Sequence, residues 1–488
     1  MEMEFDVESR SLITSAHEEE ISDTSDLKLV INGNQEQLGA VLLETEDSCD
    51  TKSTEISLEL NATQIPYNTN LQIPSQSDNH SKESEELRNL KVFEITENNI
   101  VVNTTKSENN TTNTNLEDTE STDIPCLQYD WSVASKLLYV ATEEYQPTES
   151  CENFTKGCQW SPDGTCLLVP SEDFGIRIYE LPREFYSEKV PSSFVQANFT
   201  SALTIKEGGL IYDTCWYPFM STWDPTTCCF LSTSKESPAH LWDAITGELR
   251  ATYRAYNQVD EIEASISIQF VNSASEIWCG FQNVVRTFDT NRPGRQTNDI
   301  FFKHSFPNMG GLVSCIRENP YMPGLVALGS YSKCIGLYKD GPICVFATAS
   351  GVTQVEFSSC GTKLYSGVRR NSEFLCWDLR NPGTVLYSME GRQSDTNQRI
   401  TFAITPDHKH IVSGGTDGSI TVWELPDSIT TDNDEYLNPK YRIRLSKDCI
   451  NGISLHKHLP VLATSSGQRK CGIENMHRDN SVRLWWAS

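Results

Sequence analysis

The chain alternates apolar and polar positions in a unit that recurs from residue 150 onward. Each copy contains a short alternating run, a turn with Pro, Asp or Gly, an apolar run ending in small residues, a polar loop, and a last run that ends in an aromatic and a polar residue. The clearest copy is ITFAITPDHKHIVSGGTDGSITVWEL, residues 400–425, and further copies occupy 157–181, 352–379 and 450–487. Because side chains alternate between the two faces of a strand, each copy predicts three strands and a turn.

An aromatic residue closes the third predicted strand of each copy and gives the period of the repeat. These landmarks are Tyr179, Trp242, Phe288, Tyr338, Trp377, Trp423 and Trp485. Their spacings of 63, 46, 50, 39, 46 and 62 residues bracket the roughly 40–45 residues of a WD40 blade, and the longer spacings require inserted loops. Such blades close into a ring without a long exposed sheet edge. The sequence therefore predicts an all-β fold, a seven-bladed WD40 β-propeller.

The last repeat is one strand short, because the chain stops at RLWWAS after the third strand of this repeat. KLLYVAT, residues 136–142, is a suitable outer strand ahead of the first repeat. We expect it to pair beside the last blade and close the ring. The predicted division of the chain is a tail (1–125), the closing strand of the propeller (126–149) and the propeller itself (150–488).

The first 125 residues differ from the rest in composition and charge. They hold 7 Lys and Arg against 27 Asp and Glu, a net charge of −20, whereas the remaining 363 residues hold 32 against 40, a net charge of −8. The segment has one Cys and no Trp, so it cannot bury enough apolar surface to offset the entropy of ordering. We expect a disordered acidic tail, and a folded part much less acidic than the formal net charge of −28 indicates.

The start of the chain and its cysteines predict the compartment. MEMEFDVESR has neither the cationic nor the apolar region of a secretory signal, and no window approaches 18 uninterrupted apolar residues. Fifteen of the 16 Cys lie after residue 125, mostly in apolar runs, which favours buried thiols in a reducing compartment over disulfides. We expect a protein of the cytosol or nucleus without a membrane span.

Cations gather in the loops predicted for one end of the ring, which we call the top face. In a propeller, the loops joining second to third strands and the connections from an outer to the next inner strand lie at this end. With a tyrosine and a glutamine, the cations form the candidate site: Lys156, Lys235, Arg254, Tyr256, Lys333, Arg369, Arg370, Arg399, Lys447, Gln468, Arg469 and Lys470. Carboxylates interrupt this set, and RPGR at 292–295 falls on the opposite side by the same strand order.

Three interpretations of the top face fit this pattern. Cations interleaved with Tyr256 and Tyr331 suit the phosphates and the stacked, unpaired bases of RNA. A peptide-binding face is common on the tops of propellers, and a solvated surface of mixed charge fits the same residues. The pattern of residues leaves these alternatives open.

Longer stretches beyond the generic repeat resemble the telomerase Cajal body protein family. They include ENFTKGCQWSPDG, HLWDAITGELRATYRAYNQVDE, VVRTFDTNRPGR and DCINGISLHKHLPVLATSSGQR, and the matching segments together span about 150–487. The resemblance implies an RNA-binding protein that recognises the CAB box, a short sequence in the terminal loop of H/ACA-type small Cajal body RNAs. Such proteins localise these RNAs to Cajal bodies, and in some lineages they also bind telomerase RNA.

The resemblance also implies partners and a location. The partners would be small Cajal body RNAs, telomerase RNA, H/ACA RNP proteins, coilin, the survival-motor-neuron complex and a chaperonin for folding. The location would be the nucleus and the Cajal body, with some protein in the cytoplasm. No contact with membrane or DNA is expected. The acidic tail does not resemble the family's more Pro-rich N-terminus.

The sequence offers no catalytic arrangement. It lacks the G-x-S-x-G context of a nucleophile and the G-x-x-x-x-G-K-[ST] phosphate loop. His408 and His410 fall in a predicted turn, and adjacent Cys228 and Cys229 would point to opposite faces of a strand. We expect no enzyme activity, no cofactor and no metal site. The alternative to RNA binding is a protein-interaction scaffold, for instance in chromatin repair.

Overall fold

The computed structural model describes residues 129–149, 151–187, 194–426, 436–470 and 478–488. All of them belong to one unit of the chain, Leu90–Ser488. The predicted tail lies outside the described residues. No helix in the described part of the chain is long and apolar enough to cross a membrane.

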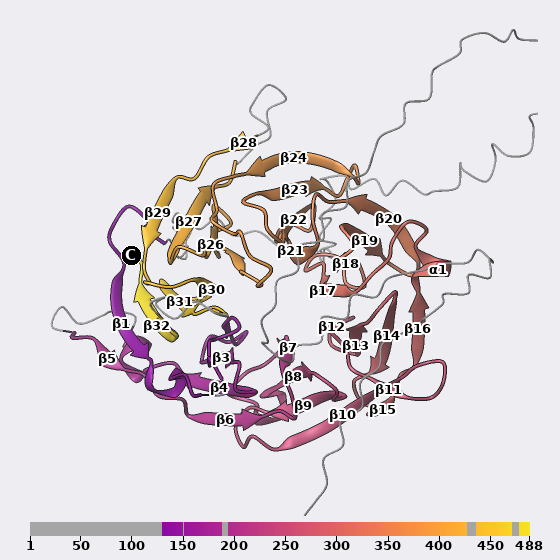
Figure 1. Cartoon of the computed structure of the whole chain (residues 1–488), viewed down its shortest axis with the longest axis horizontal. Helices are drawn as coiled ribbons and strands as arrows, with labels where there is room; N and C mark the ends of the chain where they lie inside the picture. The colour runs from indigo at the N-terminus through magenta and orange to yellow at the C-terminus, as the bar shows by residue number, and fades with distance from the viewer. Residues whose placement is uncertain (1–128, 150, 188–193, 427–435, 471–477) are drawn as a thin grey trace, which may run out of the picture. The chain divides into compact units, whose positions relative to one another are not determined.

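The described residues form seven sheets arranged in a ring, which confirms the predicted seven-bladed β-propeller (Figure 1). In each blade the strands follow one another from the centre outward. The inner strands are β2 (Gln159–Trp160), β7 (Ile211–Trp216), β12 (Ser267–Val271), β17 (Val313–Glu318), β21 (Val352–Phe357), β25 (Phe402–Ile404) and β30 (Ile450–Leu455). The second strands are β3 (Cys166–Pro170), β8 (Cys229–Ser234), β13 (Glu276–Gly280), β18 (Val326–Ser330), β22 (Lys363–Val368), β26 (His410–Ser413) and β31 (Val461–Ser466).

The outer half of each blade completes the antiparallel sheet. The third strands are β4 (Gly175–Glu180), β9 (Ala239–Asp243), β14 (Val284–Asp289), β19 (Cys334–Tyr338), β23 (Phe374–Asp378), β27 (Ser419–Glu424) and β32 (Ser481–Trp486). The outer strands are β6 (Leu203–Lys206), β10 (Leu249–Tyr256), β16 (Asn298–Phe301), β20 (Pro342–Ala347), β24 (Thr384–Met389), β29 (Tyr441–Arg444) and, for the last blade, β1 (Lys136–Ala141). A short helix, α1 (Phe302–Ser305), follows β16.

Two-residue strands cover three of the outer edges. β5 (Ala197–Asn198) pairs with β1, β11 (Ile262–Glu263) and β15 (Gly294–Arg295) pair with β10, and β28 (Tyr436–Leu437) pairs with β24. An uncovered edge strand is a template for pairing with another chain, so these additions shield the rim of the ring. β5 and β28 lie within the two longest landmark spacings, of 63 and 62 residues.

All seven landmark aromatics lie on third strands, as predicted. In three blades the landmark Trp donates its ring N–H to a hydroxyl on the neighbouring second strand. The pairs are Trp242–Ser232, Trp377–Ser366 and Trp485–Thr464, at 2.8, 2.8 and 3.0 Å. In all three blades the accepting hydroxyl lies two residues before the end of the second strand, so the hydrogen bond ties the second strand to the third at the same height.

The ring closes where the first and last parts of the propeller meet. β1 pairs antiparallel with β32, and Figure 1 shows the purple strand alongside the yellow one. On the inner side, the backbone N–H of Trp160 in β2 donates to Ser454 Oγ in β30 at 3.0 Å. KLLYVAT therefore pairs as expected, while the domain boundaries at 125/126 and 149/150 stay predictions.

The residues before β1 add a second anchor to the closing blade. The rings of Tyr129 and Trp131 stack with centroids 5.4 Å apart, and both side chains are buried. Tyr129 Oη lies 2.9 Å from the carbonyl oxygen of His456, and the N–H of Asp130 donates to Ala487 O at 2.9 Å. The chain is thus fixed to the last blade before the closing strand begins.

The hydrophobic core lies between neighbouring blades. For example, Leu231 of β8 packs with Ile277 and Phe288 of the next blade. The cysteines of the described residues are free thiols and most of them are buried, as predicted. Burial raises the pKa of Cys158 to about 12, so this thiol stays protonated and behaves as a small apolar side chain.

Candidate nucleic-acid interface

Three side chains from distant parts of the chain meet at one end of the ring. Lys156 lies in the connection before β2, Glu172 in the β3–β4 loop and Arg469 in the β31–β32 loop. Lys156 Nζ is 3.0 Å and Arg469 Nη2 is 2.6 Å from the Glu172 carboxylate. The second-to-third-strand loops and the connections to inner strands therefore share one end, as predicted for the top face.

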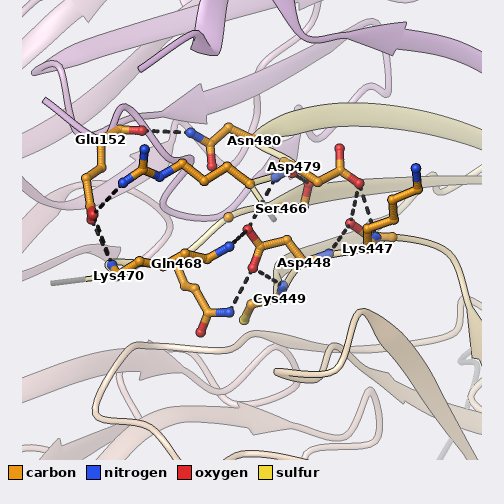
Figure 2. Close-up of polar contacts among 12 residues, drawn as sticks. Glu152, Lys447, Asp448, Cys449, Ser466, Gln468, Lys470, Asp479 and Asn480 are labelled. Atoms are coloured by element: carbon orange, nitrogen blue, oxygen red, sulfur yellow. Dashed lines mark hydrogen bonds and ion pairs between the residues drawn. The ribbon is translucent and has the colours of Figure 1, made fainter. Parts of the chain in front are cut away.

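Polar side chains around the closing blade form a group that we call the seam cluster, part of which appears in Figure 2. It consists of Glu152, Glu172, Lys447, Asp448, Gln468, Arg469, Lys470, Arg478 and Asp479. Its centre is Asp448, which accepts from Lys470 Nζ at 2.6 Å and from Gln468 Nε2 at 2.7 Å. The side chains of Lys470 and Asp448 are only 3% and 1% exposed. Lys470 is thus a buried structural cation, and its predicted place on an RNA surface does not fit this burial.

Two further carboxylates of the seam cluster meet cations. Glu152 Oε1 lies 3.5 Å from Arg478 Nη2, and Asp479 Oδ1 lies 2.6 Å from Arg483 Nη2. Burial alone would raise the pKa of Asp479, but the hydrogen bond and charge of Arg483 lower it. Lys447 donates its backbone N–H to Asp479, and Figure 2 shows its ammonium pointing away from the cluster. Arg469, Lys470 and Arg478 are therefore paired with carboxylates, whereas the ammonium of Lys447 stays exposed.

A second group of candidate residues surrounds Tyr331 in the β18–β19 loop. The guanidinium carbon of Arg369 lies 3.4 Å from the centroid of the Tyr331 ring, and Arg399 Nε lies 3.3 Å from Tyr331 Oη. Burial alone would raise the pKa of Tyr331, but the charges of Arg399 and Arg369 lower it. Arginine planes and tyrosine rings are surfaces on which unpaired bases stack.

Arg399 also connects its own blade to two other blades by hydrogen bonds. It precedes β25, yet its Nη2 donates to Ser314 O of β17 at 2.7 Å and its Nη1 to Tyr212 O of β7 at 3.3 Å. Its Nη1 is 3.9 Å from the Asp213 carboxylate. Because these contacts and Tyr331 engage the guanidinium, Arg399 acts on the top face mainly by holding three blades together.

Lys333 and Arg370 occupy the tips of turns, with positive φ angles of 63° and 48°. Both side chains are exposed. Within the described residues, no carboxylate lies within ion-pair distance of either cation, in contrast to the seam cluster. Lys235 is likewise at a loop tip, and its Nζ is 3.9 Å from the exposed carboxylate of neighbouring Glu236. These three residues present positive charge to solvent.

Arg254 and Tyr256 lie on the outer strand β10 instead of in a top-face loop. β15 runs parallel to β10 and places Arg295 opposite Arg254. The guanidinium of Arg295 lies 4.5 Å from the Tyr256 ring centroid, and Arg295 also pairs with Asp260 at 2.7 Å. The prediction that RPGR falls on the opposite side is therefore wrong for Arg295, because β15 brings it back beside β10.

The connection between β24 and β25, residues 391–400, carries polar side chains that were not predicted to belong to the site. We call it the hub loop. Gln393, Asp395 and Asn397 are exposed in it. In the sequence, the only indication of this loop's role was a polar connection bounded by Arg392 and Arg399. The sequence does not reveal what those two arginines bind.

His456 has a structural role in the loop between β30 and β31. His456 is buried, its Nε2 lies 2.9 Å from Gly164 O, and its Nδ1 accepts the N–H of Leu459 at 2.9 Å. Since a carbonyl only accepts, Nε2 carries the proton, and burial lowers the pKa of His456 to about 4. Among the described residues, no group of three His, Cys, Asp or Glu side chains could hold a metal ion.

The ring of blades and their strand order agree with a match to a known family of repeats. Residues 383–424 match the family described as WD domain, G-beta repeat. They cover the end of one blade and most of the next, from β24 to β27. The fold and this match together define a WD40 β-propeller protein.

More specific relatives then place the chain in a family. It is 44% identical over 383 residues to mouse telomerase Cajal body protein 1, which covers 73% of this chain and 70% of the relative. The human protein of that name is 40% identical over 382 residues, covering 73% and 68%, and the homolog from Drosophila melanogaster is 34% identical over 375 residues, covering 75% and 65%. The chain belongs to the telomerase Cajal body protein 1 family.

Proposed function

We propose that this chain recognises the CAB box of H/ACA-type small Cajal body RNAs and localises those RNAs to Cajal bodies, with telomerase RNA as a further ligand. The name shared by its relatives supports Cajal bodies as the site of action and telomerase as an associated activity. The observation that carries the proposal is the unshared positive charge of Lys333 and Arg370 on the same face as the Tyr331–Arg369 stack. The role is one of binding, without catalysis.

The chemistry of this face suits the tip of an RNA hairpin. Sequence-specific proteins usually bind RNA at loops, where bases are unpaired and can stack on aromatic rings or guanidinium planes. Exposed cations bind the phosphates and release counterions. Because Arg469, Lys470 and Arg478 of the seam cluster already have carboxylate partners, we assign the main phosphate contacts to the exposed Lys333 and Arg370. Lys235, whose Nζ lies 3.9 Å from the exposed Glu236 carboxylate, is a further contact.

The same proposal includes protein partners and a location in the cell. H/ACA RNP proteins, coilin and the survival-motor-neuron complex are the proposed protein partners, and a chaperonin is the proposed folding assistant. The nucleus and the Cajal body are the proposed locations, with some protein in the cytoplasm.

The test in cells is to crosslink the full chain to RNA and sequence the bound molecules. We expect enrichment of H/ACA RNAs that share one loop motif. Recovery of ribosomal background alone would overturn RNA recognition and favour the alternative, a chromatin or DNA-repair scaffold that uses the ring to bind proteins.

The test in solution is the salt dependence of binding to an H/ACA hairpin with the CAB box in its loop. Replacing Lys333 and Arg370 by Ala should weaken binding, and each lost phosphate contact should reduce the log–log slope by about 0.7. Arg292→Ala is the matched control, because it removes an exposed cation from a third-to-outer-strand loop at the other end of the ring. Equal slopes for all variants would exclude these two cations from the site.

A further inference from the structure

The hub loop, 391–400, is fixed to the blade of β22 and β24, which it leaves, and to three further blades of the propeller. Its first anchor is Arg392, whose side chain is buried and packs on the Phe374 ring at 4.2 Å. Arg392 Nη2 lies 3.1 Å from Asn371 O and 3.3 Å from Val368 O. These carbonyls flank Arg369 and Arg370, so the first anchor of the hub loop also holds the turn that presents the two cations.

The second anchor lies at the other end of the loop. Arg399 binds Ser314 O, Tyr212 O and Tyr331 Oη, and its neighbour Gln398 donates its side-chain amide to Gly467 O of the closing blade at 3.1 Å. In the middle of the loop, Thr396 O accepts the N–H of Arg370 at 3.2 Å. Contacts with the blades of β7, β17, β22 and β31 therefore fix one loop over the top face.

Between the anchors, three polar side chains point to solvent. Gln393, Asp395 and Asn397 are exposed, and within the described residues no hydrogen bond is made by their side chains. The backbone of Gln393 is held, since its carbonyl accepts the N–H of Thr416 at 3.0 Å. The loop thus combines a fixed backbone with free amide and carboxylate groups.

We propose that the hub loop is the base-reading element of the RNA site, with Gln393, Asp395 and Asn397 as its specificity-determining residues. This inference rests on the proposed RNA recognition and adds the residues that discriminate between loop sequences. Carboxamides have donors and an acceptor and can match the edge of an unpaired base, and a carboxylate accepts from base amino and imino groups. The fixed backbone means that little conformational entropy is lost when these groups bind.

In this proposal the neighbouring cations bind phosphates while the hub loop binds the edges of bases. Arg370 is hydrogen-bonded to the hub loop through its backbone, and its side chain is exposed beside it. Phosphate contacts position an RNA without reading its sequence, whereas contacts to base edges carry specificity. Substitutions in the hub loop should therefore change discrimination, and substitution of Arg370 should change affinity for all RNAs.

The experiment measures binding of the full chain to two hairpins, one with the CAB box in its loop and one with the same loop scrambled. For wild type we expect tighter binding to the CAB-box hairpin. For Asn397→Ala and Gln393→Ala we expect the preference to fall by about 5- to 100-fold each, the value of a well-placed pair of hydrogen bonds to a base. Asp395→Ala should also reduce the preference. Binding of the scrambled hairpin and its salt slope should stay unchanged.

Asn381→Ala is the matched control, because Asn381 is an exposed asparagine between β23 and β24, at the other end of the ring. It should leave the preference intact. If wild type discriminates and the three hub-loop variants discriminate equally well, the inference fails while the proposed function stands. If wild type shows no preference for the CAB-box hairpin, both fail.

Discussion

The seam cluster and the hub loop lie on the same face of the propeller and both contain several charged residues. In the seam cluster most of the cations meet carboxylates: Lys470 pairs with Asp448 and Arg469 with Glu172. In the hub loop, Arg392 and Arg399 bind mainly backbone carbonyls. Next to the loop, the side chain of Arg370 is exposed.

The difference shows that the number of cations on a surface is a poor guide to the charge that a ligand meets. A buried ion pair contributes almost no field outside the protein, whereas an exposed cation without a carboxylate neighbour attracts phosphate. The seam cluster is thus a structural device for closing the ring. The region around Arg370 is the one in which positive charge is available to RNA.

Removal of the closing strand should have the largest effect on the stability of the propeller. A chain beginning at residue 146 lacks β1, so β32 keeps β31 but loses its outer partner, and the closing blade loses its outer strand. We expect loss of the cooperative thermal transition and aggregation through the exposed edge. A chain beginning at residue 126 retains β1 and should melt like the full chain. Circular dichroism and size-exclusion chromatography measure both, and a normal transition for the shorter chain would show that β1 is dispensable.

Lys470→Met should have the next largest effect. It leaves the Asp448 carboxylate buried without its cation, at a cost of about 3–5 kcal/mol in the free energy of unfolding. Adding Asp448→Asn removes the uncompensated charge and should recover much of the loss. Denaturant unfolding measures each variant. If Lys470→Met were as stable as wild type, the buried pair would not hold the seam.

The pH dependence of stability should reflect His456, which lies in the β30–β31 loop of the closing blade. Its pKa is about 4 in the folded chain, against an ordinary value near 6.5. Between these values the unfolded chain binds more protons, so the free energy of unfolding is fully retained above about pH 6.5 and falls by up to about 3 kcal/mol as the pH drops to 4. His456→Gln should reduce this dependence, measured as the difference in melting temperature from wild type across that window. Parallel pH profiles would contradict the assignment.

Arg469→Ala should have the smallest effect. Its side chain is 40% exposed, and Glu172 keeps Lys156 as a partner after the substitution. Exposed ion pairs contribute about 0–1 kcal/mol, so stability should change by less than that. RNA affinity should fall less than for Arg370→Ala, since Arg370 has no carboxylate within ion-pair distance in the described part of the chain. Equal losses of affinity would mean that the seam also binds phosphate.

Much of the fold could be predicted because its signals are local and periodic. The spacing of landmarks such as Trp377 and Trp423 gave the number of blades, and the missing outer strand pointed to residues 136–142. These features depend on strand alternation and on the chain length of one blade, both of which are readable in a single sequence.

The candidate site could be predicted only in part, because charge partners are set by contacts distant in sequence. The loop positions of Lys333 and Arg370 follow from strand order alone. The engagement of Arg399 does not, since its partner Tyr212 is separated from it by 187 residues. The placement of Arg295 beside Tyr256 depended on a two-residue edge strand, which is too short to give a periodic signal.

The pairing of β1 with β32 also sets the order of events on the ribosome. β1 is among the first parts of the propeller to be synthesised and β32 is the last, with about 340 residues between Ala141 and Ser481. At about 5–20 residues per second, translation of that stretch takes roughly 17–70 seconds. During that time the first strand lacks its partner. A premature stop codon in the final blade would therefore disable the beginning of the ring together with its end.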